Sequence, residues 1–297
     1  MPIALTQAVV EQWVALIKGT FTVRDAWNDI GIESPEGRQH LRVILRRLED
    51  KGVISTNGSG MYRKLDTEAP VIQWQAADPN KVVPLLFPFD EHKLCRIYPK
   101  SIIIIAGSKN AGKTAYLYNF IRLNMGDFPI DLYNSETSPE QMKERFEPLS
   151  IPNPAPFTVY ERYDHFADVI RPDRVSVIDY LDMNSEVYLV GAEIDAIFRK
   201  LKDGVAIIGL QKPPPMVTYV HGVKKVIERD LAYGGGFTAK RAVLYVSMGS
   251  NKIKLVYVKT PAQPRVNPNN MTWTYQMADD GIHFTNVQRY YGEEQTG

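Results

Sequence analysis

The sequence predicts a mixed α/β fold, in which a core with a mostly parallel sheet follows a small helical domain that ends in a β-hairpin. Residues 1–66 show three stretches of helical periodicity and then two short apolar strands. Residues 67–96 contain four prolines and no sustained period, which indicates a linker and lead-in. In residues 97–297, apolar strands alternate with helical stretches. With 297 residues, two domains are expected.

The composition excludes several classes of protein. Hydrophobic residues make up 44% of the chain, which is enough for a packed core. Cys95 is the single cysteine, so neither an internal disulfide nor a cysteine metal cluster can form, which suits a cytoplasmic protein. We find no apolar run near the ~20 residues of a membrane span and no signal-peptide pattern. The net charge of +1 means that only local patches could attract nucleic acid.

The first domain is predicted to consist of three helices and a hairpin. Apolar residues at helical spacing indicate two helices in residues 9–30, and Gly31 ends the second. Ser34-Pro35 supplies an N-cap and a first-turn proline for a third helix that continues to about Lys51. Two short strands then surround a turn at residues 57–60. This order is the pattern of a winged helix-turn-helix domain.

The core is predicted from runs of aliphatic residues followed by helical stretches. Such strands are typical of a parallel sheet with helices on both faces. The last strands have no helices between them, which indicates an antiparallel extension. The predicted strands cover residues 101–106, 129–133, 157–160, 175–180, 205–210, 242–248, 253–259 and 271–275.

The strongest functional signal is a full match to the phosphate-loop pattern G-x-x-x-x-G-K-[ST], placed between an apolar strand and a helix. The amides of such a loop and the helix N-terminus face the phosphates of a nucleotide. Lys113 would contact the β- and γ-phosphates of ATP, and the Thr114 hydroxyl would bind Mg2+. The predicted loop consists of Gly107, Ser108, Lys109, Asn110, Ala111, Gly112, Lys113 and Thr114.

Two acidic residues follow other predicted strands. Asp179 ends the strand at residues 175–180, where the metal-side carboxylate of a phosphate-loop site belongs. Glu136 follows the strand at residues 129–133 and could polarise the water that attacks the γ-phosphate. Alternatively, Glu136 merely begins the helix that Ser138-Pro139 opens. Spacing alone does not choose between these two roles.

These motifs resemble those of RecA-like P-loop ATPases, especially the bacterial replicative hexameric helicases. The resemblance covers roughly residues 97–277 and rests on Asn-Ser-Glu136 before a Ser-Pro-Glu-Gln-Met helix, Val-Ile-Asp179-Tyr-Leu, and Ile-Ile-Gly-Leu-Gln211. It implies that Glu136 is the catalytic base, that Asp179 lies beside magnesium, and that Gln211 senses the γ-phosphate. Gln211 could otherwise be a polar residue at a strand end. A plasmid replication ATPase or a recombinase-like ATPase fits about as well.

The resemblance weakens near Lys259 and Arg265. The helicases carry a Lys-x-Arg pair there that reaches the nucleotide of the neighbouring subunit, whereas these two residues are six apart and lack the following glycine. Arg265 is therefore either a trans-acting finger or an ordinary solvated arginine. The resemblance implies a homo-oligomer, either a ring such as a hexamer or a filament.

Candidate DNA contacts occur in three places. Arg38, Arg42 and Arg46 share one face of the third predicted helix, and Arg63 and Lys64 follow the hairpin turn. Winged helices also dock proteins, so this surface has two possible partners. Lys224 and Lys225 lie in a stretch between Gln211 and the strand at residue 242 that is predicted to be long, irregular and DNA-facing.

Together, these observations predict an ATP-hydrolysing, oligomeric ATPase that acts on single- or double-stranded DNA with ATP and Mg2+. The five histidines are scattered without metal-ligand spacing, and no serine lies in a nucleophile elbow. The alternative function is an ATP-controlled DNA-binding regulator, or a scaffold, with slow turnover.

Overall fold

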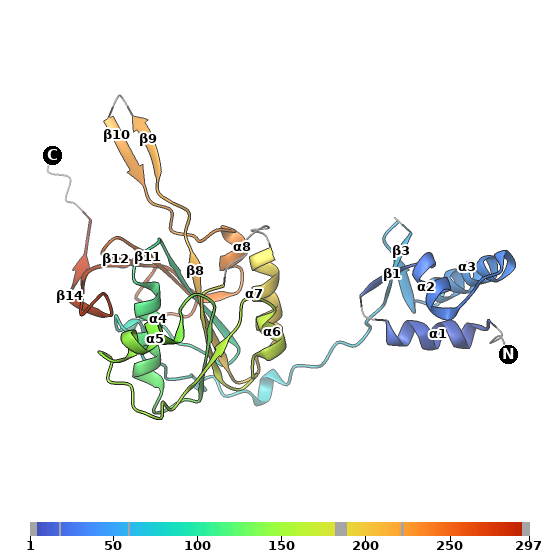
Figure 1. Cartoon of the computed structure of the whole chain (residues 1–297), viewed down its shortest axis with the longest axis horizontal. Coiled ribbons are helices and arrows are strands. Elements are labelled where there is room, and N and C mark those ends of the chain that lie inside the picture. The colour runs from blue at the N-terminus through green and yellow to red at the C-terminus, as the bar shows by residue number, and fades with distance from the viewer. Residues whose placement is uncertain (1–4, 18, 59, 182–188, 221–222, 293–297) are drawn as a thin grey trace. The chain divides into compact units, whose positions relative to one another are not determined.

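The computed structural model describes residues 5–17, 19–58, 60–181, 189–220 and 223–292, with the side chains of residues 220–226 left aside. The chain forms two compact units, Met1–Ala77 and Asp78–Gly297. Figure 1 labels their helices and strands. Within the described residues, no helix combines the length and apolar character that a membrane span requires.

The first unit contains the three predicted helices and the predicted hairpin. Its elements are α1 (Gln7–Leu16), β1 (Thr20–Thr22), α2 (Val23–Ile30), α3 (Pro35–Asp50), β2 (Ile54–Thr56) and β3 (Met61–Lys64). Ser34 caps α3 by accepting a hydrogen bond from the Gly37 amide, and Gly31 ends α2 in the left-handed conformation. The sheet has the order β1-β3-β2. The sequence prediction missed β1, because three residues are too few to show an alternation.

The segment that follows residue 77 packs onto the second unit, although residues 67–96 were predicted to be a linker and lead-in. Leu85, Phe87, Phe89 and Ile97 are buried in the core of that unit. The prolines interrupt any helical or strand period but do not prevent burial, so periodicity alone could not detect this packing. Short 3-10 turns occur at Trp74–Ala76 and Glu91–Lys93.

The second unit is built on a nine-stranded sheet of order β14-β13-β12-β11-β4-β8-β7-β5-β6. The strands from β11 to β6 are parallel, and β12, β13 and β14 extend the sheet in antiparallel pairs. This arrangement confirms the predicted mixed α/β architecture. The strands are β4 (Ser101–Gly107), β5 (Ile130–Asn134), β6 (Thr158–Glu161), β7 (Val175–Asp179), β8 (Val205–Gln211), β11 (Ala242–Gly249), β12 (Lys252–Val258), β13 (Thr272–Ala278) and β14 (His283–Tyr290).

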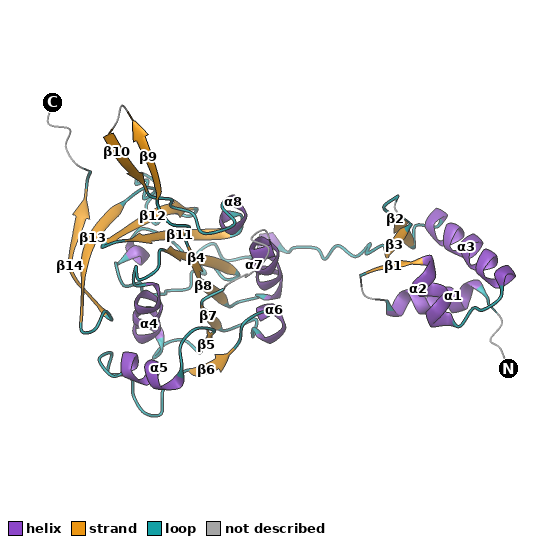
Figure 2. Ribbon diagram, turned by 45° about the horizontal axis from the view of Figure 1, so that its top comes forward, coloured by secondary structure: helices purple, strands orange, loops and turns teal. Residues whose placement is uncertain are grey.

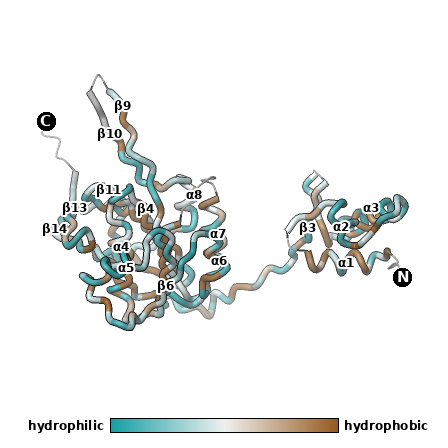
Figure 3. The backbone as a smooth tube through the Cα atoms, viewed as in Figure 1, coloured by the Kyte–Doolittle hydropathy of each residue, from teal (hydrophilic) through white to brown (hydrophobic). Residues whose placement is uncertain are grey.

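Helices cover both faces of this sheet (Figure 2), and the central strands are therefore apolar on both sides. In β4, Ile103 and Ile105 join the core beneath α4, whereas Ile102 and Ile104 join the core on the α7 side. Hydrophobic residues, brown in Figure 3, gather in these inner strands. The helices are α4 (Lys113–Asn124), α5 (Pro139–Phe146), α6 (Phe166–Val169), α7 (Leu189–Lys200) and α8 (Gly236–Ala239).

The sequence analysis predicted that the stretch between Gln211 and residue 242 is irregular, and the structure contradicts this prediction. It contains the antiparallel hairpin of β9 (Met216–Val220) and β10 (Val223–Ile227), which projects from the rest of the unit (Figure 1). Three consecutive prolines precede β9 and favoured the loop interpretation. The β-branched residues of both strands are the signal that would have corrected it.

Candidate nucleotide-binding site

The phosphate loop connects the central strand β4 to α4. Gly107 ends β4 in register with Gln211 of β8 and Met248 of β11. Asn110 (φ 60°) and Gly112 (φ 82°) are left-handed, which curls the loop before the first turn of α4. The predicted strand–loop–helix context is therefore present.

Lys113 folds back over this loop. Its Nζ donates a hydrogen bond to Ser108 O at 3.4 Å. A Cβ at Gly107 would lie 2.5 Å from Lys113 Cγ, so glycine leaves the room that this lysine occupies. Burial lowers the pKa of the Lys113 ammonium, and the charges of Asp179 and Glu136 oppose that shift. The ammonium is thus partly desolvated and available to an anionic ligand.

Asp179 lies beneath Thr114 at the end of β7. The Thr114 hydroxyl donates a hydrogen bond to Asp179 Oδ1 at 3.3 Å, and Oδ2 has no hydrogen-bond partner among the described residues. The side chain is fully buried, and this burial raises the pKa of Asp179 to about 6; the Thr114 hydrogen bond opposes the shift.

A buried carboxylate oxygen without a partner, next to a hydroxyl group, fits the oxygen ligands that Mg2+ prefers. In the described parts of the chain, no three His, Cys, Asp or Glu side chains form a metal cluster. A magnesium ion held here would complete its shell with phosphate oxygens and water, as this ion does in nucleotide sites.

Glu136 follows β5 on a loop held by side-chain hydrogen bonds. Asn134 Nδ2 donates to Thr137 O at 2.6 Å, and the Thr137 amide donates to Asn134 Oδ1 at 3.0 Å. The cap of α5 is made by Ser138 and Gln141, which exchange hydrogen bonds with each other's backbone amides. Glu136 takes no part in that cap, and its side chain lines the cavity beside the phosphate loop.

This cavity, of about 290 Å³, brings together residues from five separate segments of the chain. Of the predicted site residues, most of the phosphate loop, Glu136 and Gln211 line it. Asp179 reaches it through Thr114. The lining residues are Lys109, Asn110, Ala111, Gly112, Lys113, Thr114, Ala115, Glu136, Arg145, Gln211, Met277, Asp280, Gly281 and Ile282.

Two parts of this wall were missed by sequence reasoning. Arg145 is an exposed residue of α5 whose positive charge acts on Asp179 and opposes the rise in pKa that burial causes there. The sequence signal was a basic residue on the helix that follows Glu136. The other part is the turn between β13 and β14, held by Asn119 Nδ2, which donates to Ile282 O at 2.7 Å. We find no motif that could have placed this turn beside the phosphate loop.

The remaining predicted residues lie outside the cavity. Lys259 and Arg265 are exposed and do not line the cavity of their own chain. Lys224 and Lys225 belong to β10, but their side chains lie outside the described set.

The predicted DNA-contact residues of the first unit are exposed, but Arg38 is arranged differently from the other arginines of α3. Arg42 and Arg46 are exposed on α3, and Arg63 and Lys64 are exposed on β3. The Arg38 guanidinium stacks over the Trp27 ring at 4.6 Å from its centroid, so it does not simply extend the stripe.

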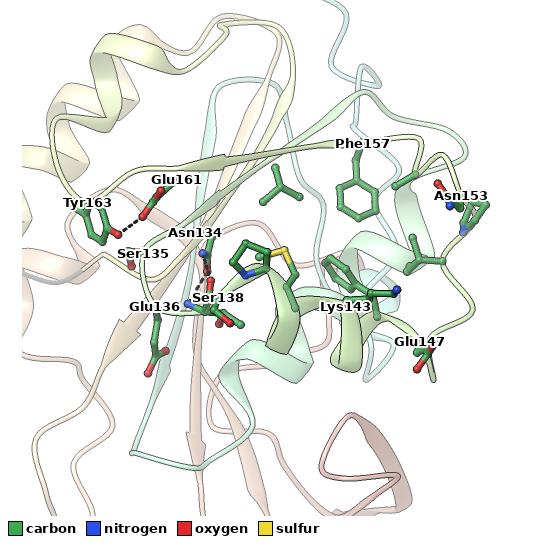
Figure 4. A pocket seen from close by; sticks show the side chains of 18 residues that line it. Asn134, Ser135, Glu136, Ser138, Lys143, Glu147, Asn153, Phe157, Glu161 and Tyr163 are labelled. Carbon is green, nitrogen blue, oxygen red and sulfur yellow. Dashed lines mark hydrogen bonds between the residues drawn. The ribbon is translucent and has the colours of Figure 1, made fainter.

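A larger hollow of about 1000 Å³ lies on the other side of the Glu136 loop (Figure 4). Met142 and Phe146 of α5 and Phe157 before β6 give it an apolar lining. At its rim, the Tyr163 hydroxyl donates a hydrogen bond to Glu161. The short loop that carries Glu136 thus separates this hollow from the nucleotide cavity.

Similarity to known proteins is found among solved structures. No protein-family model matches the chain, and neither does any curated protein. The RadB recombinase is similar with a TM-score of 0.42 and 12% identity, over 64% of this chain and 92% of that one. The solved ATPase domain of a helicase is similar with a TM-score of 0.48 and 14% identity, over 73% of this chain and 95% of that one. Because both TM-scores and both identities are low, the fold assignment rests on the strand order of the sheet and the geometry of the phosphate loop in this chain.

Proposed function

We propose that the chain is a RecA-like P-loop ATPase that binds Mg-ATP, hydrolyses it, and acts on DNA as an oligomer. One observation supports this proposal above the others. The cavity beside Lys113 is also lined by Glu136 and Gln211, and the Thr114–Asp179 pair lies at its edge. A phosphate-binding loop, a carboxylate base and an orphan carboxylate oxygen are the components that phosphoryl transfer to water requires.

Each residue then has a defined role. The loop amides and the Lys113 ammonium bind the phosphates, and Thr114 and Asp179 hold magnesium. Bound magnesium neutralises charge that develops on the phosphate oxygens. Glu136 orients a water molecule in line with the γ-phosphate and accepts its proton. Gln211 and Arg145 also line the cavity and would contact the terminal phosphate, where the positive charge of Arg145 would stabilise the transition state.

Assembly would complete the site. Lys259 and Arg265 are exposed outside the cavity of their own chain, so either could act only on a neighbouring subunit's nucleotide. Sedimentation with and without a non-hydrolysable ATP analogue tests this part of the proposal. A chain that stays monomeric in both states would remove the trans-acting role.

The role of Glu136 in ATP hydrolysis is tested with two substitutions and a matched control. Lys113→Ala should abolish binding of a fluorescent ATP analogue. Glu136→Gln should bind it with unchanged affinity but hydrolyse ATP about 10²–10⁴-fold more slowly. Glu144→Gln, an exposed change on α5, should behave as wild type. Wild-type hydrolysis by Glu136→Gln would remove the residue from the mechanism.

We propose that the first unit is a winged-helix domain that binds duplex DNA through α3. The exposed Arg42 and Arg46 lie one turn apart on this helix and can neutralise phosphates along a groove. The double Arg42→Ala, Arg46→Ala variant should weaken duplex binding and reduce the slope of log affinity against log salt by about 2. The control removes two exposed cations from the other unit, Lys81 and Lys93. An unchanged salt slope in the arginine variant would favour protein docking.

A further inference from the structure

Lys212 is a buried lysine immediately beyond Gln211, the residue that lines the nucleotide cavity. It is only 3% exposed, and its Nζ donates a hydrogen bond to Ser247 Oγ of β11 at 2.9 Å. Its backbone amide donates to Gly107 O, at the start of the phosphate loop, at 2.9 Å. Lys212 therefore joins the end of β8 to the adjacent strand β4 and to β11, the next strand beyond β4.

The charges that balance Lys212 come from the other end of the β9–β10 hairpin. Burial lowers the pKa of the Lys212 ammonium, and the negative charges of Glu228 and Asp230 oppose this shift. Both acids follow β10 directly. Asp230 also accepts a hydrogen bond from Lys254 Nζ of β12 at 2.7 Å. We call Lys212, Glu228, Asp230 and Lys254 the hairpin clamp.

Glu228 also packs against Gly249, which is linked to the phosphate loop through Tyr275. A Cβ at Gly249 would lie 2.6 Å from Glu228 Oε2, so this carboxylate occupies its present position because residue 249 has no side chain. The Tyr275 hydroxyl lies 3.2 Å from Gly249 O and 2.8 Å from Ala111 O, and shares its proton between them. Two residues, Gly249 and Tyr275, thus link the returning end of the hairpin to the loop that would hold the phosphates.

We propose that Lys212 is a positioning residue that couples the nucleotide cavity to the β9–β10 hairpin through the hairpin clamp. The inference rests on the proposed nucleotide site and concerns its regulation. Both ends of the hairpin are fixed at the edge of that site, by Lys212 before β9 and by Glu228 after β10. A shift of Gln211 or Ala111 on nucleotide binding moves these anchors together and re-orients the hairpin. Without the ammonium, Glu228 loses an opposing charge, whereas Asp230 keeps its ion pair with Lys254.

Hydrogen–deuterium exchange of the full-length chain tests this coupling without requiring DNA. Exchange of the amides in residues 213–230 is measured with and without magnesium and a non-hydrolysable ATP analogue. In the wild type, nucleotide should change these exchange rates about fivefold or more. In Lys212→Met, which keeps the length of the side chain but removes its charge, the change should be less than about twofold. The affinity for the analogue should stay within about twofold of wild type.

Three further variants separate coupling from general structure. Lys93→Met removes an exposed, ion-paired lysine elsewhere in the unit and should retain the wild-type response. Lys212→Arg keeps the charge and should restore at least part of the response. Glu228→Gln changes the clamp at an exposed residue, so it tests the same coupling even if Lys212→Met does not fold. It should lose the response as Lys212→Met does.

The outcomes distinguish this inference from the proposed function. If the wild type binds no analogue, the nucleotide site itself is wrong. If it binds but the hairpin exchange does not change, the coupling is refuted while the site stands. A wild-type response in both Lys212→Met and Glu228→Gln also refutes it. Loss of analogue affinity in Lys212→Met would make Lys212 part of the binding site rather than a link to the hairpin.

Discussion

Glu91 is a buried carboxyl group that supports the helix following the phosphate loop. Tyr116 of α4 donates a hydrogen bond to Glu91 Oε1 at 2.7 Å, and the Phe89 amide donates to Oε2 at 2.9 Å. Burial raises the pKa of Glu91 from 4.5 to about 7, although both hydrogen bonds act in the opposite direction. The folded chain therefore keeps a proton on Glu91 at pH values where the unfolded chain has released it.

This proton makes stability depend on pH with a definite sign. Since the folded state binds more protons between pH 4.5 and about 7, the free energy of unfolding falls as pH rises through that window. The difference of about 2.5 pH units corresponds to about 3 kcal/mol. Above pH 7, Glu91 is ionised in both states, and its contribution no longer changes.

Replacing Glu91 with glutamine should remove this dependence. Glutamine keeps an oxygen acceptor for Tyr116 but turns an N–H group toward the Phe89 amide, which costs about 1 kcal/mol. Glu91→Gln should therefore be about 1 kcal/mol less stable than wild type at about pH 4 and about 2 kcal/mol more stable at about pH 8. Urea denaturation of the full chain, followed by far-ultraviolet circular dichroism at several pH values, measures the difference.

The change of sign between the two pH values is the critical result. Asp179, whose pKa burial raises to about 6, adds a slope in the same direction, but it does so in both proteins and cancels in the comparison. Glu144→Gln, at an exposed residue, should follow the wild-type curve throughout. A stability difference between Glu91→Gln and wild type that stays constant from about pH 4 to about pH 8 would refute this reasoning.

Three further substitutions test other contacts around the site. Gly249→Ala places a methyl group 2.6 Å from the present position of Glu228 Oε2, and because this exposed, flexible carboxylate can move aside, the unfolding free energy should fall by no more than about 0.5 kcal/mol in denaturant titrations. Tyr275→Phe removes the hydroxyl beside the phosphate loop and should weaken binding of an ATP analogue about fivefold, measured by fluorescence titration. Ser138→Ala removes the cap of α5 and should cost about 1 kcal/mol in thermal unfolding and slow ATP turnover, since Glu136 lies on the loop before the cap. A loss of more than about 1 kcal/mol in the Gly249 variant would contradict the first of these predictions. Unchanged analogue affinity in Tyr275→Phe, or unchanged turnover in Ser138→Ala, would contradict the other two.

Local sequence was sufficient for the elements whose signals are short-range. Ser34-Pro35 and Ser138-Pro139 mark helix starts, and the loop before Lys113 follows an apolar strand, as these patterns predict. Glu136 and Asp179 could be selected because each follows such a strand. The hairpin of β9 and β10 was obscured by the prolines before it, although its strand residues were typical.

The sequence by itself determined the mixed α/β fold, the phosphate loop and the two acidic residues near it, because each depends on residues adjacent along the chain. Only the tertiary structure decided that Arg145 and the β13–β14 turn complete the cavity, and that Lys212 faces Ser247. It also buried the proline-rich segment that contains Glu91. The physical reason is the strand order of the sheet: pairing of strands distant in sequence places these side chains together, and no local pattern encodes that pairing.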